Sequence, residues 1–209
     1  MKLRSRQSLP LLASFALFCL LGLDVANPAM AQEPVRVRGQ IISLNGDVLN
    51  VKSREGADVA VTLTADAGIA YVRRVRIEDV KAGTPLGTAA VKGPDGKLIA
   101  RELHIFPADR PIPAEGFRPW DLEPGSTMTN ARVSAIGAAS GNLEITLSYK
   151  DGQQQIIVPP NIPVVDTVDS DRSALKSGEY VLINGMRAAD GKISAPRVLV
   201  SRDGVRPPQ

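Results

Sequence analysis

The chain has 209 residues, of which 44% are hydrophobic and 22% are charged, and its formal net charge at pH 7 is +3. This length is enough for one or two small domains. The single cysteine, Cys19, excludes a disulfide within the chain, and the single histidine, His104, excludes a metal site built from several histidines.

The N-terminal segment has the three parts of a secretory signal peptide. Basic residues at positions 2, 4 and 6 precede an apolar run at 9–23, and small residues follow up to Ala31. The apolar run is shorter than the roughly 18–20 residues that a membrane-spanning helix needs. We therefore expect a protein that is periplasmic or secreted, with cleavage between Ala31 and Gln32 and no transmembrane segment afterwards.

Removal of this leader changes the charge of the chain. The leader's charged residues are Lys2, Arg4, Arg6 and Asp24, with a net charge of +2, which leaves +1 of the original +3. A nearly neutral mature chain has no electrostatic reason to bind nucleic acid or anionic lipid. Cys19 also leaves with the leader, so the mature chain has no thiol for catalysis or metal binding.

Short runs that alternate apolar and polar residues predict a mainly all-β chain. The runs lie at 35–44, 48–53, 58–64, 98–106, 143–149, 155–158, 180–186 and 193–201. Several are separated by dipeptides that favour tight hairpin turns, namely Asn45-Gly46, Glu55-Gly56, Asp95-Gly96, Asp151-Gly152 and Asp190-Gly191. Helical periodicity is limited to 76–82 and 171–176, and both pieces end near a glycine.

A shift of 95 residues brings turn and helix-end residues of the two halves into register. The triplet 95–97 (Asp-Gly-Lys) falls on the same triplet at 190–192. The other identical pairs are Ile41/Ile136, Gly46/Gly141, Lys81/Lys176, Gly83/Gly178 and Ala100/Ala195. We therefore predict two copies of one domain in tandem, at 35–106 and 129–203, followed by a tail at 204–209.

Each copy has the predicted order strand, strand, strand, short helix, strand, strand. This order is typical of the OB-fold, a small five-stranded barrel, and a β-sandwich is the alternative. The motifs RPWDLEPGSTMTNA (118–131) and LKSGEYVLINGMRAADGKISAPRV (175–198) resemble those of a group of exported bacterial proteins of unknown function with OB-like domains. The resemblance implies two tandem OB-like barrels and no particular activity. Relatives often have histidine where this chain has Phe117, so the resemblance implies no metal site here.

A proline-rich segment at 107–128 connects the two copies. Its five prolines exclude a continuous strand or helix, and a solvated linker would not contain Phe117 and Trp120. We interpret the segment as a strap that packs these aromatic rings on one or both barrels and fixes their orientation. The alternative is a ligand clamp formed by Arg118, Trp120 and Asp121 at the inter-domain groove. Arg118 and Asp121 are also expected to pair with each other.

His104 is the only candidate for histidine-dependent catalysis. If Leu103 and Ile105 face the barrel interior, strand alternation places Glu102 and His104 on the outer face, where we expect solvent. A solvated histidine is therefore the simplest interpretation.

These observations predict a non-catalytic binding or adaptor protein with no cofactor and no metal. Its partner is a small ligand or an envelope protein, and nucleic acid is not expected because the chain lacks a basic groove with stacking aromatics. The alternative is a hydrolase that uses His104 with Glu102, Asp109 or Asp121 at the inter-domain groove. The candidate ligand-binding residues are His104, Arg118, Trp120 and Asp121.

Overall fold

A computed structural model describes residues 32–139 and 141–208. The predicted leader at 1–31 lies outside these residues. Within them the chain forms twelve strands and two 3₁₀ helices, which confirms the mainly all-β prediction. The strands are β1 (Glu33–Asn45), β2 (Val48–Ser53), β3 (Asp58–Arg74), β4 (Pro85–Lys92), β5 (Leu98–Ile105), β6 (Gly116–Pro119), β7 (Thr127–Ala139), β8 (Asn142–Tyr149), β9 (Gly152–Val158), β10 (Val164–Ser170), β11 (Tyr180–Arg187) and β12 (Ile193–Val200). The helices are η1 (Ile77–Asp79) and η2 (Arg172–Ala174), which lie inside the two predicted helical pieces.

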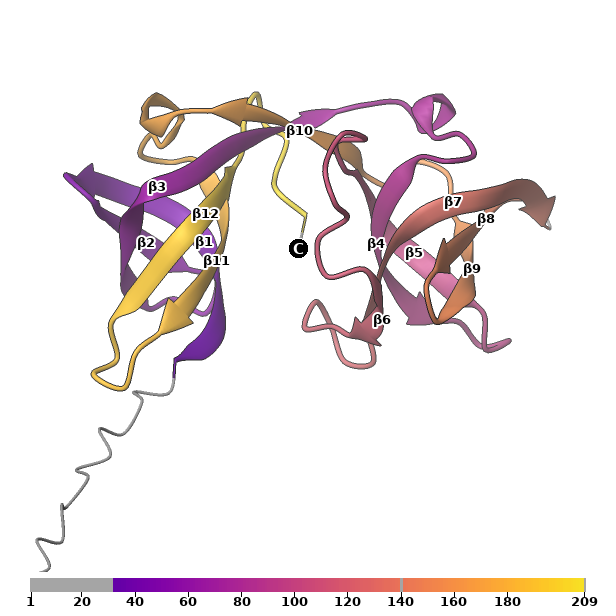
Figure 1. The fold of residues 1–209 in the computed structure, drawn as a ribbon, viewed down its shortest axis with the longest axis horizontal. Helices are drawn as coiled ribbons and strands as arrows, with labels where there is room; N and C mark the ends of the chain where they lie inside the picture. The colour runs from indigo at the N-terminus through magenta and orange to yellow at the C-terminus, as the bar shows by residue number, and fades with distance from the viewer. Residues whose placement is uncertain (1–31, 140, 209) are drawn as a thin grey trace, which may run out of the picture.

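Five strands close the first barrel, on the left of Figure 1. Their order around the barrel is β1-β2-β3-β12-β11, and β11 pairs with β1 to complete the ring. All of these pairings are antiparallel except that of β3 with β12. Alternate residues of the five strands fill the interior, together with Leu175, which directly follows η2.

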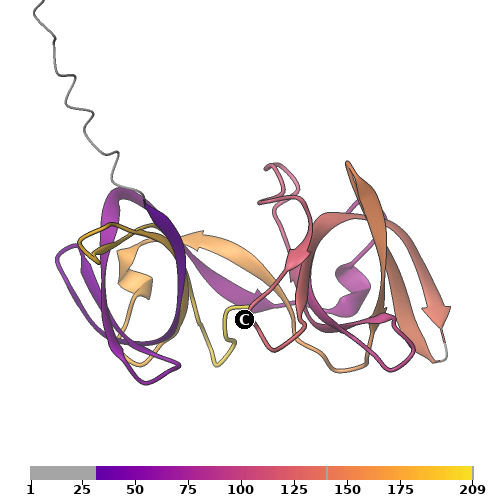
Figure 2. The same cartoon turned by 90° about the horizontal axis from the view of Figure 1, so that it is seen from below.

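The second barrel, on the right of Figure 1, has the same plan. Its order is β7-β8-β9-β5-β4, with β4 pairing back to β7, and the one parallel pairing is between β9 and β5. Val80, directly after η1, belongs to its core. Viewed along a perpendicular direction, the barrels appear as two rings that lie side by side, each with its short helix (Figure 2).

Each barrel takes strands from both halves of the chain. The first combines β1–β3 with β11 and β12, and the second combines β4 and β5 with β7–β9. The predicted division into one barrel at 35–106 and another at 129–203 therefore does not match the two cores. The reason is that β3 continues straight beyond the first barrel as far as Arg74 and does not turn back, so β4 and β5 begin in the second barrel.

An antiparallel crossing of β3 with β10 joins the two barrels at the top of Figure 1. Residues 69–74 of β3 pair with residues 165–170 of β10. The register is nearly symmetric under the 95-residue shift, because Ala70 pairs with Asp169 and Arg74 pairs with Val165. The crossing is therefore a pseudo-twofold contact through which the two copies exchange their last two strands.

The Asp-Gly-Lys triplets occupy matching hairpins, between β4 and β5 and between β11 and β12. The N–H of Lys97 donates to Asp95 Oδ1 (3.1 Å) and the N–H of Lys192 donates to Asp190 Oδ1 (3.0 Å). The glycines in these turns have φ of +80° and +83°, which side chains disfavour. The turn chemistry that identified the repeat is thus the same in both copies.

The first strands do not follow the 95-residue shift. Gly178 N–H donates to Ile41 O (2.9 Å) and Gly83 N–H donates to Val133 O (2.8 Å), so Ile41 corresponds to Val133 and not to Ile136. Ile41 is 2% exposed, whereas Ile136 is 41% exposed. Both β1 and β7 contain a β-bulge, at 41–43 and at 133–135. Beyond its bulge, β7 pairs with β8 over more residues than β1 pairs with β2, and Ile136 lies in this longer, exposed part of the hairpin.

The strand exchange predicts which cysteine pairs can be cross-linked. Thr62 of β3 lies opposite Ser194 of β12 in the parallel pairing. In a tandem arrangement Ile99, which is 95 residues before Ser194, would take this place. In a Cys19→Ser background, we expect Thr62→Cys/Ser194→Cys to give the fluorescent intramolecular product of dibromobimane, a short thiol cross-linker.

The matched pair Thr62→Cys/Ile99→Cys is expected to stay at background fluorescence. Mass spectrometry of the product at low protein concentration separates cross-links within one chain from those between chains. The reverse pattern, with the second pair cross-linked and the first not, would mean that each copy closes its own barrel.

Candidate functional site

A cavity of about 340 Å³ lies where the outer faces of the two barrels meet. We call it the inter-barrel pocket. Residues from β1, β11 and β12 line it on one side, and residues from β4, β5, β7 and the strap line it on the other. The lining residues are Arg36, Gly87, Ala89, Glu102, His104, Phe106, Pro113, Ala114, Arg118, Trp120, Met128, Asn130, Leu182, Asn184, Arg197, Leu199 and Pro208.

Three of the four predicted site residues, His104, Arg118 and Trp120, line this pocket together. The fourth, Asp121, does not line it but follows Trp120 directly. Asp109, one of the three candidate partners of His104 in the hydrolase alternative, is exposed and lies outside the lining.

The strap contains a short strand of four residues, although its prolines exclude a continuous strand. β6 pairs with β7 from Gly116 to Pro119, and its last residue is itself a proline. Among the described residues β6 pairs only with β7, so β6 is an edge strand. An edge strand tolerates proline, because no second strand needs the N–H that proline lacks. Asn130 of β7 also donates to Pro113 O (2.7 Å), which holds the preceding loop.

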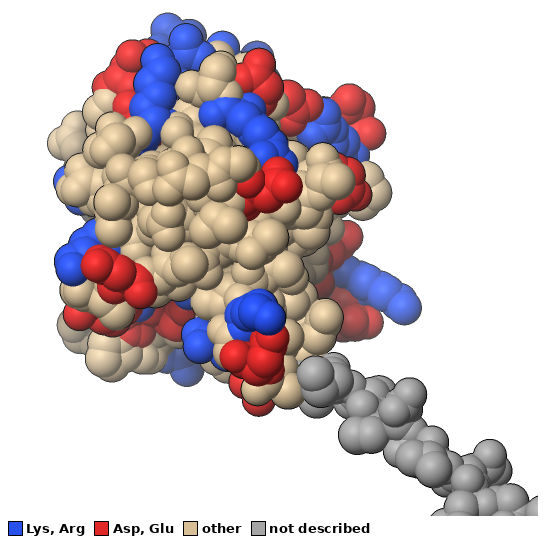
Figure 3. Space-filling view, turned by 90° about the vertical axis from the view of Figure 1, so that its left-hand side faces the viewer, with Lys and Arg blue, Asp and Glu red and all other residues tan. Residues whose placement is uncertain are grey.

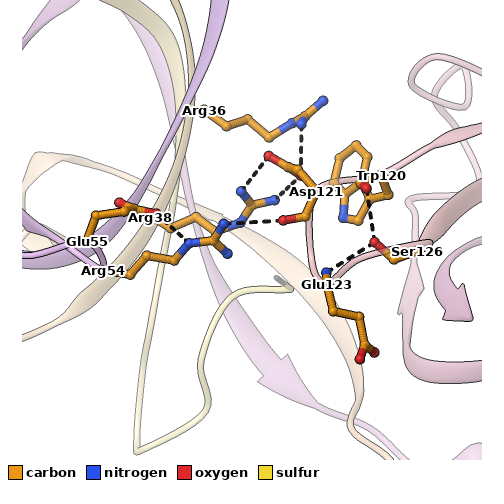
Figure 4. A network of polar contacts seen from close by, with 8 residues as sticks. All are labelled: Arg36, Arg38, Arg54, Glu55, Trp120, Asp121, Glu123 and Ser126. Atoms are coloured by element: carbon orange, nitrogen blue, oxygen red, sulfur yellow. Dashed lines mark hydrogen bonds and ion pairs between the residues drawn. The ribbon is translucent and has the colours of Figure 1, made fainter.

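Asp121 joins the strap to the first barrel (Figure 4). Arg38 of β1 donates to both of its carboxylate oxygens (3.0 and 2.9 Å), and Arg36 lies 3.0 Å away as a second ion pair. Arg54 adds a hydrogen bond to the Asp121 backbone carbonyl (3.2 Å). The hydrogen bonds from Arg38 are the main cause that lowers the pKa of Asp121 to about 2. Burial opposes them, and the charges of Arg38 and Arg36 lower the pKa further.

The expected pair between Arg118 and Asp121 is not formed. Arg118 Nη1 instead donates to Ala114 O at 2.6 Å within the strap. The carboxylate of Asp121 is already bound by Arg38, whose side chain is only 4% exposed and needs a counter-charge. Burial and the nearby charge of Arg36 lower the pKa of Arg118.

Of the two aromatic residues expected to pack, only Trp120 does so. Its ring centroid lies 3.9 Å from Cζ of Arg36 and 5.4 Å from Cζ of Arg118, so it contacts cations from the first barrel and from the strap. Phe117 is 41% exposed, because alternation along β6 turns it to the opposite side from Arg118. The strap is therefore held to the first barrel mainly by charged groups.

Glu102 and His104 face outward from the second barrel, as strand alternation predicts, but the expectation of solvent there is wrong. Leu103 lies between them, fully buried in the barrel core, while Glu102 is only 8% exposed. The outer face of β5 is covered by the first barrel, which supplies Leu182, Leu199 and Arg197 to the same pocket. The sequence of β5 alone gives no signal that the first barrel covers its outer face.

His104 is held as a neutral imidazole. Its ring packs on Phe106 with 4.6 Å between centroids, and Nε2 is buried without a hydrogen-bond partner. Burial, and secondarily the charge of Arg197, lowers the pKa of His104 from 6.5 to about 4. At neutral pH the ring is therefore an uncharged, weakly basic group at the wall of the pocket.

The C-terminal tail reaches the pocket, which the sequence had not suggested. Pro207 and Pro208 are buried, and Pro208 is one of the lining residues. In Figure 1 the end of the chain lies between the two barrels. Two adjacent prolines after Arg206 were the available signal, because such a pair forms an extended segment that packs against apolar surfaces.

A larger cavity of about 620 Å³ lies at the end of the second barrel, beside η1. At the corresponding end of the first barrel, Arg172 pairs with Asp47 (2.6 Å) and donates to Gly46 O (3.1 Å). The second barrel has Ile77 where the shift places Arg172, so it lacks these two contacts. None of the predicted site residues lies there.

Within residues 32–139 and 141–208, no group of three or more His, Cys, Asp or Glu is placed to hold a metal ion. No helix in the same part of the chain is both long and apolar enough to cross a membrane. Comparisons of the chain with protein-family models, with curated proteins and with solved structures found no match.

The environment of His104 predicts a specific pH dependence of stability. Between pH 6.5 and about 4 the unfolded chain binds a proton at His104 that the folded chain does not, so stability decreases as the pH falls through this window. His104→Gln should remove this decrease, which is on the order of 2 kcal/mol at pH 4. The measurement is urea unfolding of both proteins at pH 7, 5.5 and 4.5.

Because His104 is the only histidine in the chain, carboxylates are the main other groups that titrate in this range, and they are the same in both proteins. His104→Phe is a second variant that also lacks the titrating group. Parallel pH profiles for wild type and both variants would contradict the neutral, half-buried state of His104.

Proposed function

We propose that the protein is a non-catalytic binding or adaptor module that is periplasmic or secreted, and that the inter-barrel pocket is its binding site. The observation that carries the proposal is the convergence of unlike groups on one cavity. Trp120, three arginines, an unpartnered imidazole nitrogen of His104 and several apolar side chains all line it. Binding sites are typically concave, mainly apolar and provided with a few convergent polar groups.

We further propose that each barrel is an OB-fold whose last two strands come from the other copy. The strand order of the first barrel, with β3 parallel to β12 and a short helix before β11, supports this assignment. The second barrel repeats it with β9 and β5. OB-folds act mainly as binding modules, but fold analogy names no ligand.

The chemistry of the pocket favours binding over hydrolysis. An imidazole with a pKa of about 4 is a weak general base at neutral pH. Asp121 is occupied by Arg36 and Arg38, so it does not orient His104. The lining residues in the described part of the chain carry no aliphatic hydroxyl or thiol that could act as a nucleophile.

The outer face of the first barrel does not have the charge pattern of a nucleic-acid-binding surface. On the outer face of the first barrel, positive and negative side chains are intermixed around a central area without charged groups (Figure 3). Single-strand binders instead need a continuous positive groove with stacking aromatic rings.

Export is part of the proposal and has its own test. We expect the protein recovered from the periplasm or from the medium to begin at Gln32, because cleavage follows the small residues before it. Intact-mass measurement of the protein from its native host reads this directly. A mature species that retains residues 1–31 would refute the proposed localisation.

The binding proposal predicts a ligand that depends on the pocket. Native mass spectrometry of the protein isolated from its own compartment should show a non-covalent adduct, and its release should change the emission of Trp120, the only tryptophan in the chain. Asn184→Tyr, which adds bulk at the pocket wall, should reduce the adduct about tenfold or more.

The matched control is Ile42→Tyr, an equally bulky substitution at an exposed position of β1 that does not line the pocket. It should retain the adduct. If both variants lose the adduct equally, or both retain it equally, the ligand does not bind in this pocket.

A further inference from the structure

The last described residues form an anchored turn, after which the chain runs to the inter-barrel pocket. After β12, Ser201 is fixed by two hydrogen bonds with the backbone of Tyr180, both 2.7 Å. A tight turn follows, in which Arg202 and Val205 exchange backbone hydrogen bonds of 3.1 and 2.9 Å. Its central residues, Asp203 and Gly204, both have positive φ, which is the geometry that reverses a chain within two residues.

Two cation–π contacts hold this segment on the first barrel. Cζ of Arg202 lies 4.1 Å from the ring centroid of Tyr71, and Cζ of Arg206 lies 3.7 Å from that of Tyr180. Both arginines precede Pro207 and Pro208 in the sequence. The proline pair therefore follows an anchored turn. From here on the tail means residues 202–208, because the turn at 202–205 belongs with the tail that the sequence predicts at 204–209.

A proline pair suits the surface that it meets. Proline has no N–H, so two of them can be buried without leaving a backbone donor unpaired, and the pair is already extended before binding. The pocket wall around it includes Phe106, Trp120 and two leucines of the first barrel. Grooves lined by aromatic rings are the usual receptors for extended proline-containing segments.

We propose that the inter-barrel pocket binds an extended, proline-containing segment of a partner protein, and that the tail occupies this site until the partner displaces it. The inference rests on the proposed binding function and names its ligand class. The tail is the occupant that defines this class, because Pro208 lines the pocket and Pro207 beside it is also buried.

The charges of the pocket add a preference within this class. Three arginines, Arg36, Arg118 and Arg197, line the pocket. Glu102 is the one acidic residue in the lining. A partner with an acidic residue directly after its prolines therefore fits better than one with a basic residue.

A tethered occupant competes strongly with a free one. A short covalent connection gives the tail an effective concentration on the order of millimolar, so a free peptide of similar affinity binds the intact protein weakly. Removing the tail should then strengthen binding of the same peptide by about tenfold or more.

The test compares three proteins. They are the intact chain, a chain that ends at Val205 and so keeps the turn, and the full-length double variant Pro207→Asp/Pro208→Asp. The probe is a synthetic peptide with the sequence of residues 202–209, RDGVRPPQ, and the control peptide has both prolines replaced by alanine. The readout is the emission of Trp120.

We expect both tail variants to show a red-shifted emission of Trp120, because the buried prolines no longer cover the pocket. The proline peptide should reverse the shift with saturation, at least tenfold more tightly than it binds the intact chain, and the alanine peptide should not. A peptide with glutamate directly after the prolines should bind several-fold more tightly than one with lysine there.

The double variant keeps the test valid if the shortened chain does not melt cooperatively. If the variants bind the adduct found on the isolated protein but not the proline peptide, the peptide class is wrong and the proposed binding function stands. If the variants bind neither, and the emission of Trp120 is unchanged, both proposals fail. Equal peptide affinity for the intact chain and the variants would overturn the role of the tail.

Discussion

The antiparallel pairing of β3 with β10 is the interaction on which the rest of the structure depends. It is the place where the two copies cross, and it requires β3 to remain extended over all 17 residues from the first barrel to the second. If β3 ended with the first barrel, β4 and β5 could close that barrel. In the structure β11 and β12 close it instead. The ion pair between Arg73 and Asp166 (2.6 Å) lies in this crossing and is more than half exposed on the arginine side, so backbone pairing is its main support.

The inter-barrel pocket is a consequence of this crossing. Because the exchanged strands run from one barrel to the other, the outer faces of β5 and β12 are brought towards each other, and groups that alternation alone would leave in solvent are buried. The strap also connects the two barrels, because its Asp121 forms ion pairs with Arg36 and Arg38 of β1. Trp120 has cation–π contacts with Arg36 of the first barrel and with Arg118 of the strap, and it belongs to neither barrel core.

Features that depend on neighbouring residues could be predicted from the sequence, whereas the choice of distant partners could not. The two Asp-Gly-Lys turns and the two short helices were found because glycine at positive φ and the helix ends leave local signals. β4 was missed because six of its eight residues are buried without alternation, as expected for a strand covered on both sides. Tandem and exchanged barrels have the same local patterns, since both bury the same faces. The partner of Asp121 lies 83 residues away, so proximity in sequence pointed to Arg118 instead.

The strand exchange also sets the order in which the molecule can be completed as the chain emerges from its N-terminus. The ring that begins with β1 needs β11 and β12, so well over one hundred residues must follow β3 before this ring closes. During this interval β3 has an unpaired edge, a surface to which other chains bind readily. The strands of the second ring, by contrast, are all complete once β9 is made. The barrel built from the middle of the chain can therefore form first and act as the template on which the barrel built from its two ends is assembled.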